Sequence, residues 1–284
     1  MTAQRSAVRP EDLSSWRECI GRSEVRKDVI DAGQLKRFAT AVGSVVDVER
    51  EAPPLAHWAF FVDTLPADRL GEDGHAERGT GVYPSITLPR RLFASSSIEL
   101  REPLTPGGEA ELTLTLTDVR HRAGRSGDTV LIDVERRLRQ AGRERIVERQ
   151  TIAYRPSMQP MVPIKCATRE VSDAEQPWTP RPTELFRFSA VTFNAHRIHY
   201  DERYATQAEG YPGLVVQGPL TAIKLFAFAQ ARLKKPIRHF SFRAVAPLFV
   251  DQPVTFAVGA EPNRVACIRW DGKVAMTAAA SGAE

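Results

Sequence analysis

Three side chains suited to acid–base chemistry lie within six residues in the second half of the chain: Asn194, His196 and His199. A neutral imidazole takes up and releases protons near pH 7, and a carboxamide both donates and accepts hydrogen bonds. Two histidines three residues apart also share a helix face, as metal ligands often do. The glutamate of an H-E-x-x-H motif is absent, however, and no clear third ligand is evident. We therefore predict acid–base chemistry and no metal; for His196, packing alone stays an open alternative.

The residues around these side chains resemble a family motif. Anchored on His199-Tyr-Asp201 and Ala205, the segment matches the H-x-D-x-x-x-A part of S-G-D-x-N-P-[LI]-H-x-D-x-x-x-A, the motif of MaoC-like (R)-specific enoyl-CoA hydratases. The resemblance implies that His199 is the catalytic histidine. It places Asn194 where the family has aspartate, and His196 where the family has asparagine. The spelling T-F-N-A-H-R-I-H-Y-D instead resembles the branch of mesaconyl- and itaconyl-CoA hydratases and mitochondrial 3-hydroxyacyl-thioester dehydratases.

A second segment, Val215-Val-Gln-Gly-Pro-Leu-Thr221, resembles the family's I-A-H-G-M-L-T. In that motif the glycine amide contacts the thioester oxygen, so the resemblance gives this role to Gly218. A backbone N–H at the start of a helix faces developing negative charge with the helix dipole behind it. An ordinary turn glycine is the alternative.

The reaction implied by the resemblance is the reversible addition of water to an α,β-enoyl thioester. It requires a deprotonated water, a proton for Cα and stabilisation of the enolate. His199 can act as base in one direction and as acid in the other. Asn194 cannot take a proton, but its amide can hold the water or the leaving hydroxyl by two-way hydrogen bonding. We expect no cofactor beyond the coenzyme A that the substrate carries.

The mesaconyl- and itaconyl-CoA hydratases that the segment resembles act on short, branched dicarboxylic acyl-CoAs, so the resemblance implies a substrate of this type. A buried substrate carboxylate needs a cationic partner, and the planar fork of arginine suits that task. Arg197 lies beside the histidines, and Arg90 and Arg91 lie in residues 88–93, which resemble the companion half of double-domain members. Solvent exposure is the alternative for each arginine. The predicted substrate-binding residues are His196, Arg197, Arg90 and Arg91, with Trp58 and Phe60 as further candidates for the pocket wall.

Apolar and polar patterning predicts two successive units of helix and antiparallel sheet. Residues 11–41 have a helix-like composition, with Asp12, Ser14 or Ser15 as candidate N-caps and Gly33 or Gly43 as a candidate end. Strand-like patterns follow at 58–62, 97–101, 110–117, 129–135 and 146–154. In the second half we expect a helix over 217–233 and strands over 237–244, 254–258, 265–270 and 274–279.

Six prolines from Pro156 to Pro182 interrupt these patterns, because proline removes a backbone donor and fixes φ. We predict an N-terminal half over 1–158 that forms the acyl pocket wall, a proline-rich linker over 159–182, and a catalytic half over 183–284. The element order predicts an α+β fold. The resemblance specifies a double hot-dog, with two helices each wrapped by an antiparallel sheet, acting as a homodimer or as a monomeric pseudodimer.

Composition narrows the class of protein. The chain has 284 residues, of which 42% are hydrophobic and 26% charged, and no apolar run approaches the ~20 residues of a membrane span. No signal peptide is evident, so we expect a soluble cytoplasmic protein. Cys19, Cys166 and Cys267 are scattered, which argues against disulfides and a zinc site.

The net charge of +4 raises nucleic-acid binding as a possible function. The arginines of residues 120–125 and 136–149 are interleaved with acidic residues in strand patterns, so an exposed strand face explains them better. We predict an acyl-CoA partner, no nucleic acid and no membrane. A non-catalytic acyl-thioester-binding hot-dog, which the missing aspartate would suit, and an acyl-CoA thioesterase remain alternatives.

Overall fold

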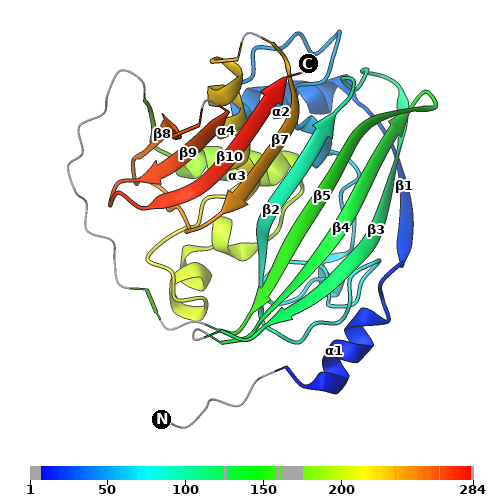
Figure 1. Cartoon of the computed structure of the whole chain (residues 1–284), viewed down its shortest axis with the longest axis vertical. Helices are drawn as coiled ribbons and strands as arrows, with labels where there is room; N and C mark the ends of the chain where they lie inside the picture. Colours follow the sequence, from blue (N-terminus) through cyan, green and yellow to red (C-terminus); the bar gives the residue numbers. More distant parts are fainter. Residues whose placement is uncertain are drawn as a thin grey trace.

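The computed structural model describes residues 8–124, 127–157, 160–161, 175–233, 235–261 and 263–282. Its strands form one antiparallel sheet, and helices α2, α3 and α4 gather behind it in Figure 1. The helices are α1 (Pro10–Arg17), α2 (Ala32–Val42), α3 (Pro182–Val191) and α4 (Gly218–Gln230). The strands are β1 (Ser23–Val29), β2 (Arg90–Leu100), β3 (Glu109–Arg122), β4 (Thr129–Gln140), β5 (Arg143–Arg155), β6 (Gln176–Trp178), β7 (Ile237–Ala244), β8 (Val254–Val258), β9 (Arg264–Arg269) and β10 (Val274–Gly282).

The strand order shows how the two halves of the chain combine. It runs β1-β3-β4-β5-β2-β7-β10-β9-β8-β6, so five strands from the first half lie beside four from the second, followed by β6 from the predicted linker. The junction is the antiparallel pair β2 and β7, from Ser95 opposite Arg243 to Glu99 opposite His239. Helix α4 packs on β7, β9 and β10, and one hydrophobic core contains residues of both halves. The predicted α+β antiparallel architecture is confirmed.

Local sequence explains the main helices. In α2 the apolar Leu35, Phe38 and Val42 recur at helical spacing and are buried. The carboxylate of Asp31 caps this helix by accepting the N–H of Gln34 at 2.6 Å. Gly43, with φ of 73°, ends it in the left-handed conformation, as one of the two predicted glycines was expected to do.

Two predictions of local structure are wrong. Residues 58–62 do not form a strand: a 3₁₀ helix, η1 (Ala56–Ala59), precedes an irregular segment. Residues 11–41 are not all helical either, because β1 lies between α1 and α2. β1 is a polar edge strand with alternating exposure, so its sequence lacks the apolar pattern of a core strand. The N-cap of α1 is Arg9, so none of the three candidate residues caps it.

Within the predicted linker, β6 pairs with β8 and forms the last strand of the sheet. Pro177 is tolerated there because an edge strand leaves one row of backbone groups unpaired. Pro182 occupies the first turn of α3, where its missing N–H removes no helical hydrogen bond. Residues 162–174, including Cys166, lie outside the described part of the chain; Cys19 and Cys267 are buried free thiols.

Glu148 of β5 is fully buried and ties η1 to the sheet. Its carboxylate accepts hydrogen bonds from His57 Nε2 at 3.0 Å, Trp58 Nε1 at 3.1 Å and Ser96 Oγ at 2.7 Å. Burial opposes the charge, but the hydrogen bond and charge of His57 outweigh it and lower the pKa of Glu148 to about 2. The network explains why Trp58 does not continue the predicted strand: its side chain, like that of His57, turns inward to this carboxylate.

We predict that Glu148→Gln lowers the free energy of unfolding by about 3–5 kcal/mol, because the variant leaves buried donors without their acceptor. Urea titration followed by circular dichroism measures the change. Glu144→Gln on the same strand is the matched control, since its arginine partners Arg101 and Arg137 are both over 40% exposed. Such a surface pair contributes at most about 1 kcal/mol. Equal losses in the two variants would contradict the structural role of Glu148.

Candidate active site

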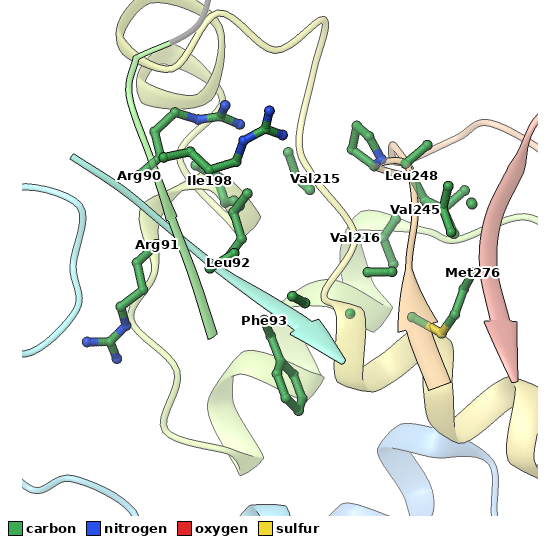
Figure 2. A pocket seen from close by; sticks show the side chains of 18 of the residues that line it. Arg90, Arg91, Leu92, Phe93, Ile198, Val215, Val216, Val245, Leu248 and Met276 are labelled. Atoms are coloured by element: carbon green, nitrogen blue, oxygen red, sulfur yellow. The ribbon is translucent and has the colours of Figure 1, made fainter. Parts of the chain in front are cut away.

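Residues from both halves of the chain line a cavity of about 580 Å³. Its wall includes Asn194, His196, His199 and Gly218 from the second half, and Arg90 and Arg91 from β2. Figure 2 shows an apolar wall of Val215, Val216, Val245, Leu248 and Met276 across the cavity from the β2 residues. Six of the seven predicted site residues therefore meet at one cavity.

His199 ends a short 3₁₀ helix, η3 (Arg197–His199), and is buried. Its Nδ1 lies 2.7 Å from the carbonyl oxygen of Val215. A carbonyl only accepts hydrogen bonds, so Nδ1 carries the proton and Nε2 keeps its lone pair. Burial lowers the pKa of His199 to about 4. The ring is therefore neutral at pH 7 and available as a base.

Gly218 is the first residue of α4, with Gln217 as its N-cap. The N–H groups of a first helical turn have no partner inside the helix, so the Gly218 N–H is available to a ligand. The fully buried Gln217 side chain holds this turn in place: its Nε2 donates to Leu185 O and to Ser189 Oγ, each at 2.9 Å. The helix start is thereby fixed against α3.

Asn194 has less freedom than its sequence suggests. Its Oδ1 accepts the backbone N–H of His196 at 3.0 Å, and its own N–H donates to Ser189 O at 2.8 Å. The carboxamide oxygen is therefore engaged in the turn, which leaves Nδ2 as the group that can donate to a ligand. The sequence suggested that the Asn194 amide both donates to and accepts from a ligand; in the structure only donation from Nδ2 remains.

A third imidazole, from His75 in the first half of the chain, also lines the cavity. Its Nδ1 lies 3.1 Å from Oδ2 of Asp73. The ring centroid of His196 lies 4.0 Å from that of His75 and 5.1 Å from that of His199. Sequence reasoning missed His75 and Asp73, because no motif marks them and more than a hundred residues separate them from the histidines.

One ligand atom from each of Asp73, His75 and His196 lies within 4.8 Å of the others, a spacing compatible with a metal ion. The surroundings disfavour a cation. Arg78 Nη2 lies 3.4 Å from the Asp73 carboxylate, and the charges of Arg91 and Arg78 act to lower the pKa of both His75 and His196. Asp73 and His75 already satisfy one another by hydrogen bonding. The cluster fits a hydrogen-bonded pair better than a metal centre.

The three predicted arginines have different environments. Arg90 is buried, forms an ion pair with Glu209 at 3.2 Å and donates to the Tyr211 hydroxyl. Arg197 pairs with Asp201 at 2.7 Å and does not line this cavity. Arg91 lies over the Tyr83 ring, and no carboxylate of the described residues forms an ion pair with it. Figure 2 shows Arg90 and Arg91 leaving β2 on opposite sides.

A second cavity, of about 700 Å³, adjoins the first. The residues that line both are His75, Arg91, Phe93, Asn194 and Pro219. Its wall includes the predicted residues Trp58 and Phe60, together with Arg136 and Gln150 of the first half. His75 and Asn194 thus lie at the junction of the two cavities, whereas His196 and His199 line only the first.

Comparison with known proteins identifies the chemistry of this arrangement. The model of the hydroxyacyl-thioester dehydratase type 2 family matches residues 55–250. The chain belongs to this family. It is 40% identical over 255 residues to the mesaconyl-C(4)-CoA hydratase of Chloroflexus aurantiacus, an alignment that covers 88% of this chain and 90% of that protein. The protein is thus a hydro-lyase that hydrates or dehydrates CoA thioesters, which disfavours the non-catalytic and thioesterase alternatives.

Solved structures establish the fold within this dehydratase family. HtdX of Mycobacterium tuberculosis superposes with a TM-score of 0.66 at 15% identity, over 92% of this chain and all of that one. A second protein of that organism, described as a double hot-dog, gives a TM-score of 0.54 at 11% identity, over 93% and 97% of the two chains. The predicted double hot-dog is confirmed. Among the described residues, no helix has the length and apolar character needed to cross a membrane, and the cytoplasmic location stays a prediction.

We predict that the acidic limb of the pH dependence of kcat/KM lies near pH 4 instead of near 6.5. Burial lowers the pKa of both His199 and His75 to about 4, and falling pH removes activity only when these imidazoles become protonated. Steady-state kinetics from roughly one unit below these pKa values up to about pH 8 measures the limb.

Circular dichroism at each pH is the control. The unfolded chain protonates its histidines near pH 6.5, above the folded pKa, so stability also falls as the pH drops below that value. A limb near pH 6.5 in protein that is still folded would contradict the buried, neutral histidines.

Proposed function

We propose that the protein catalyses the reversible hydration of a short, branched enoyl-CoA of the mesaconyl or itaconyl type, whose acyl group carries a free carboxylate in addition to the thioester. The observation that carries this proposal is Arg91, a cation beside the catalytic groups without an ion-pair partner among the described residues. The 40% identity to a mesaconyl-C(4)-CoA hydratase supports the same substrate class.

In the proposed hydration, Nε2 of His199 takes a proton from water as the oxygen bonds to Cβ. The electron pair of the C=C bond moves toward the thioester, whose oxygen accepts the N–H of Gly218 at the start of α4. The imidazolium of His199 then returns the proton to Cα. Asn194 donates from Nδ2 to the oxygen that becomes the hydroxyl. Water and proton transfer account for all atoms, so we propose that no cofactor beyond the substrate's own coenzyme A takes part.

The two cavities suggest how the substrate lies. Arg122 and Arg243 are exposed and line the first cavity, where their charges suit the phosphates of coenzyme A. Arg91, Trp58 and Phe93 line the second cavity, which would hold the end of the acyl group. All these residues come from one chain, so we propose that a monomeric pseudodimer is sufficient for activity.

Among the three nominated arginines, Arg91 suits the substrate carboxylate. The guanidinium of Arg90 is engaged by Glu209 and Tyr211, and that of Arg197 by Asp201 and the carbonyl of Glu72. A second carboxylate at either position would compete with an existing partner. At Arg91 it would supply the missing countercharge, and a charged hydrogen bond of this kind contributes about 1.5–3 kcal/mol.

We expect His199→Ala to fold and to lose hydration by roughly 100-fold or more, because the variant lacks its general acid–base group. The loss of alkene absorbance of the enoyl-CoA measures the rate. His196→Ala should lose less, since its ring packs between two other imidazoles. Turnover near that of the wild type in folded His199→Ala would remove His199 from the mechanism.

We expect the wild type to prefer mesaconyl- or itaconyl-type CoA esters over crotonyl-CoA in kcat/KM, and Arg91→Gln to reduce that preference by about 10- to 100-fold. The turnover of crotonyl-CoA, whose acyl group has no carboxylate, should change little. Arg90→Gln and Arg197→Gln are the matched controls and should keep the preference. The proposal fails if the wild type prefers unbranched medium-chain enoyl-CoAs, or if either control variant alone loses the preference.

A further inference from the structure

Residues 71–76 bring an imidazole to the cavity that neither sequence motif contains. We propose that His75, oriented by Asp73, is a second catalytic histidine, which binds the hydrogen of the reacting water or hydroxyl that His199 does not take. This inference rests on the hydration chemistry and on the site of the proposed function, but not on the dicarboxylate substrate.

The position of His75 is fixed by backbone packing against the catalytic segment. Gly74 has φ of 83°, and a Cβ there would lie 1.9 Å from the carbonyl oxygen of Ala195, so only glycine fits. The backbone N–H of Arg197 donates to Asp73 O at 2.9 Å, and its guanidinium donates to Glu72 O at 3.1 Å. The loop of the first half is thereby clamped two residues from His199.

The tautomer of His75 follows from its partner. Asp73 Oδ1 accepts the backbone N–H of His75 at 3.0 Å, and Oδ2 lies 3.1 Å from Nδ1 of the ring. Burial opposes the charge of Asp73, but its two hydrogen bonds from His75 and the nearby positive charge together outweigh burial and keep the pKa of Asp73 low. The carboxylate is therefore ionised and can only accept. Nδ1 therefore carries the proton, and Nε2 of His75 presents a lone pair.

Burial and the nearby arginines keep His75 neutral. Asp73 and Arg78 face it from its own loop, Arg91 from β2, and His196 and His199 from the segment after α3. Burial, followed by the charge of Arg91, lowers the pKa of His75 to about 4 in spite of Asp73. Both His75 and His199 are thus neutral acceptors at pH 7.

Two neutral acceptors match the two hydrogens of one water molecule. In hydration, His199 takes one proton while the other hydrogen stays on the oxygen, bound to Nε2 of His75, and becomes the hydroxyl hydrogen. This arrangement turns a lone pair of the oxygen toward Cβ. His75 also supplies an acceptor that Asn194 cannot. The resembled motif has aspartate at position 194, whereas the Asn194 amide donates hydrogen bonds and cannot accept a proton.

The location of His75 agrees with this role. His199 is hydrogen-bonded to the carbonyl of Val215, three residues before Gly218. Since Gly218 is proposed to bind the thioester oxygen, His199 lies on the side of the thioester carbonyl and Cα. His75 lines the junction of the two cavities together with Asn194, farther along the acyl group. The proposed contact with the oxygen at Cβ follows from that order.

The test compares His75→Ala, Asp73→Asn and the double variant, with whichever enoyl-CoA the wild type hydrates fastest. We expect His75→Ala to lower kcat by about 100-fold while KM changes little. In Asp73→Asn, the carboxamide oxygen keeps the hydrogen bond from the backbone N–H of His75, and the NH₂ group faces Nδ1. Nδ1 must then accept, so the proton moves to Nε2 of His75. We expect kcat to fall by about 10- to 100-fold. The double variant should be no slower than His75→Ala, because Asp73 acts through His75.

His121→Gln is the matched control, since His121 forms a comparable pair with Asp128 at 2.8 Å on β3 and lines neither cavity. It should keep wild-type turnover. Circular dichroism checks that each variant folds. Additive losses in the double variant would reduce Asp73 to a structural role, and folded His75→Ala with a kcat within about threefold of wild type would overturn the proposal.

Treatment of the wild type with a chelator distinguishes the proposed histidine pair from a metal centre. Hydration should be unchanged by EDTA, whereas loss of activity restored by Zn²⁺ would show that Asp73, His75 and His196 bind a metal instead. If His199→Ala stays active while His75→Ala does not, the assignment of His199 as the base in the proposed function is wrong, and the catalytic role of His75 is retained.

Discussion

The candidate active site depends on one backbone contact, the packing of residues 71–76 against residues 195–197. Gly74 lies against the Ala195 carbonyl so closely that no side chain fits between them, and Asp73 accepts the N–H of Arg197. This contact brings His75 of the first half to the histidines of the second. The β2–β7 pairing supports the same alignment from the sheet, because Arg91 and Phe93 leave β2 beside the junction of the cavities.

Burial is the dominant influence on the chemistry of this site. It lowers the pKa of His75, His196 and His199, so the cavity contains three neutral imidazoles. Neutral rings accept protons and hydrogen bonds, whereas imidazolium ions would repel the nearby arginines. The low polarity of the Val215 and Leu248 wall also strengthens the interaction between the Gly218 N–H and a developing oxyanion.

Local motifs made part of the candidate site predictable. His199 and Gly218 stand in contiguous patterns whose chemistry is local: an imidazole on a short helix and an N–H at a helix start. The strands of the second half were also predictable, because their apolar residues alternate; β7 and β8 have the expected bounds. His75 was not predictable, since its role depends on a loop that meets the histidines only in the folded chain. Arg90 and Arg91 could not be ranked from sequence, because neighbours on a strand point to opposite sides and nothing local fixes which side is the pocket.

A crystal structure with a non-hydrolysable thioether or saturated analogue of the substrate's CoA ester tests the central claim most directly. The account predicts the carbonyl or equivalent oxygen within about 3 Å of the Gly218 nitrogen, a typical hydrogen-bond length. It also predicts that Cβ lies between His199 and His75, with the acyl end toward Arg91. An acyl group that enters the cavity with its carbonyl away from Gly218, or its Cβ out of reach of both histidines, would contradict the account.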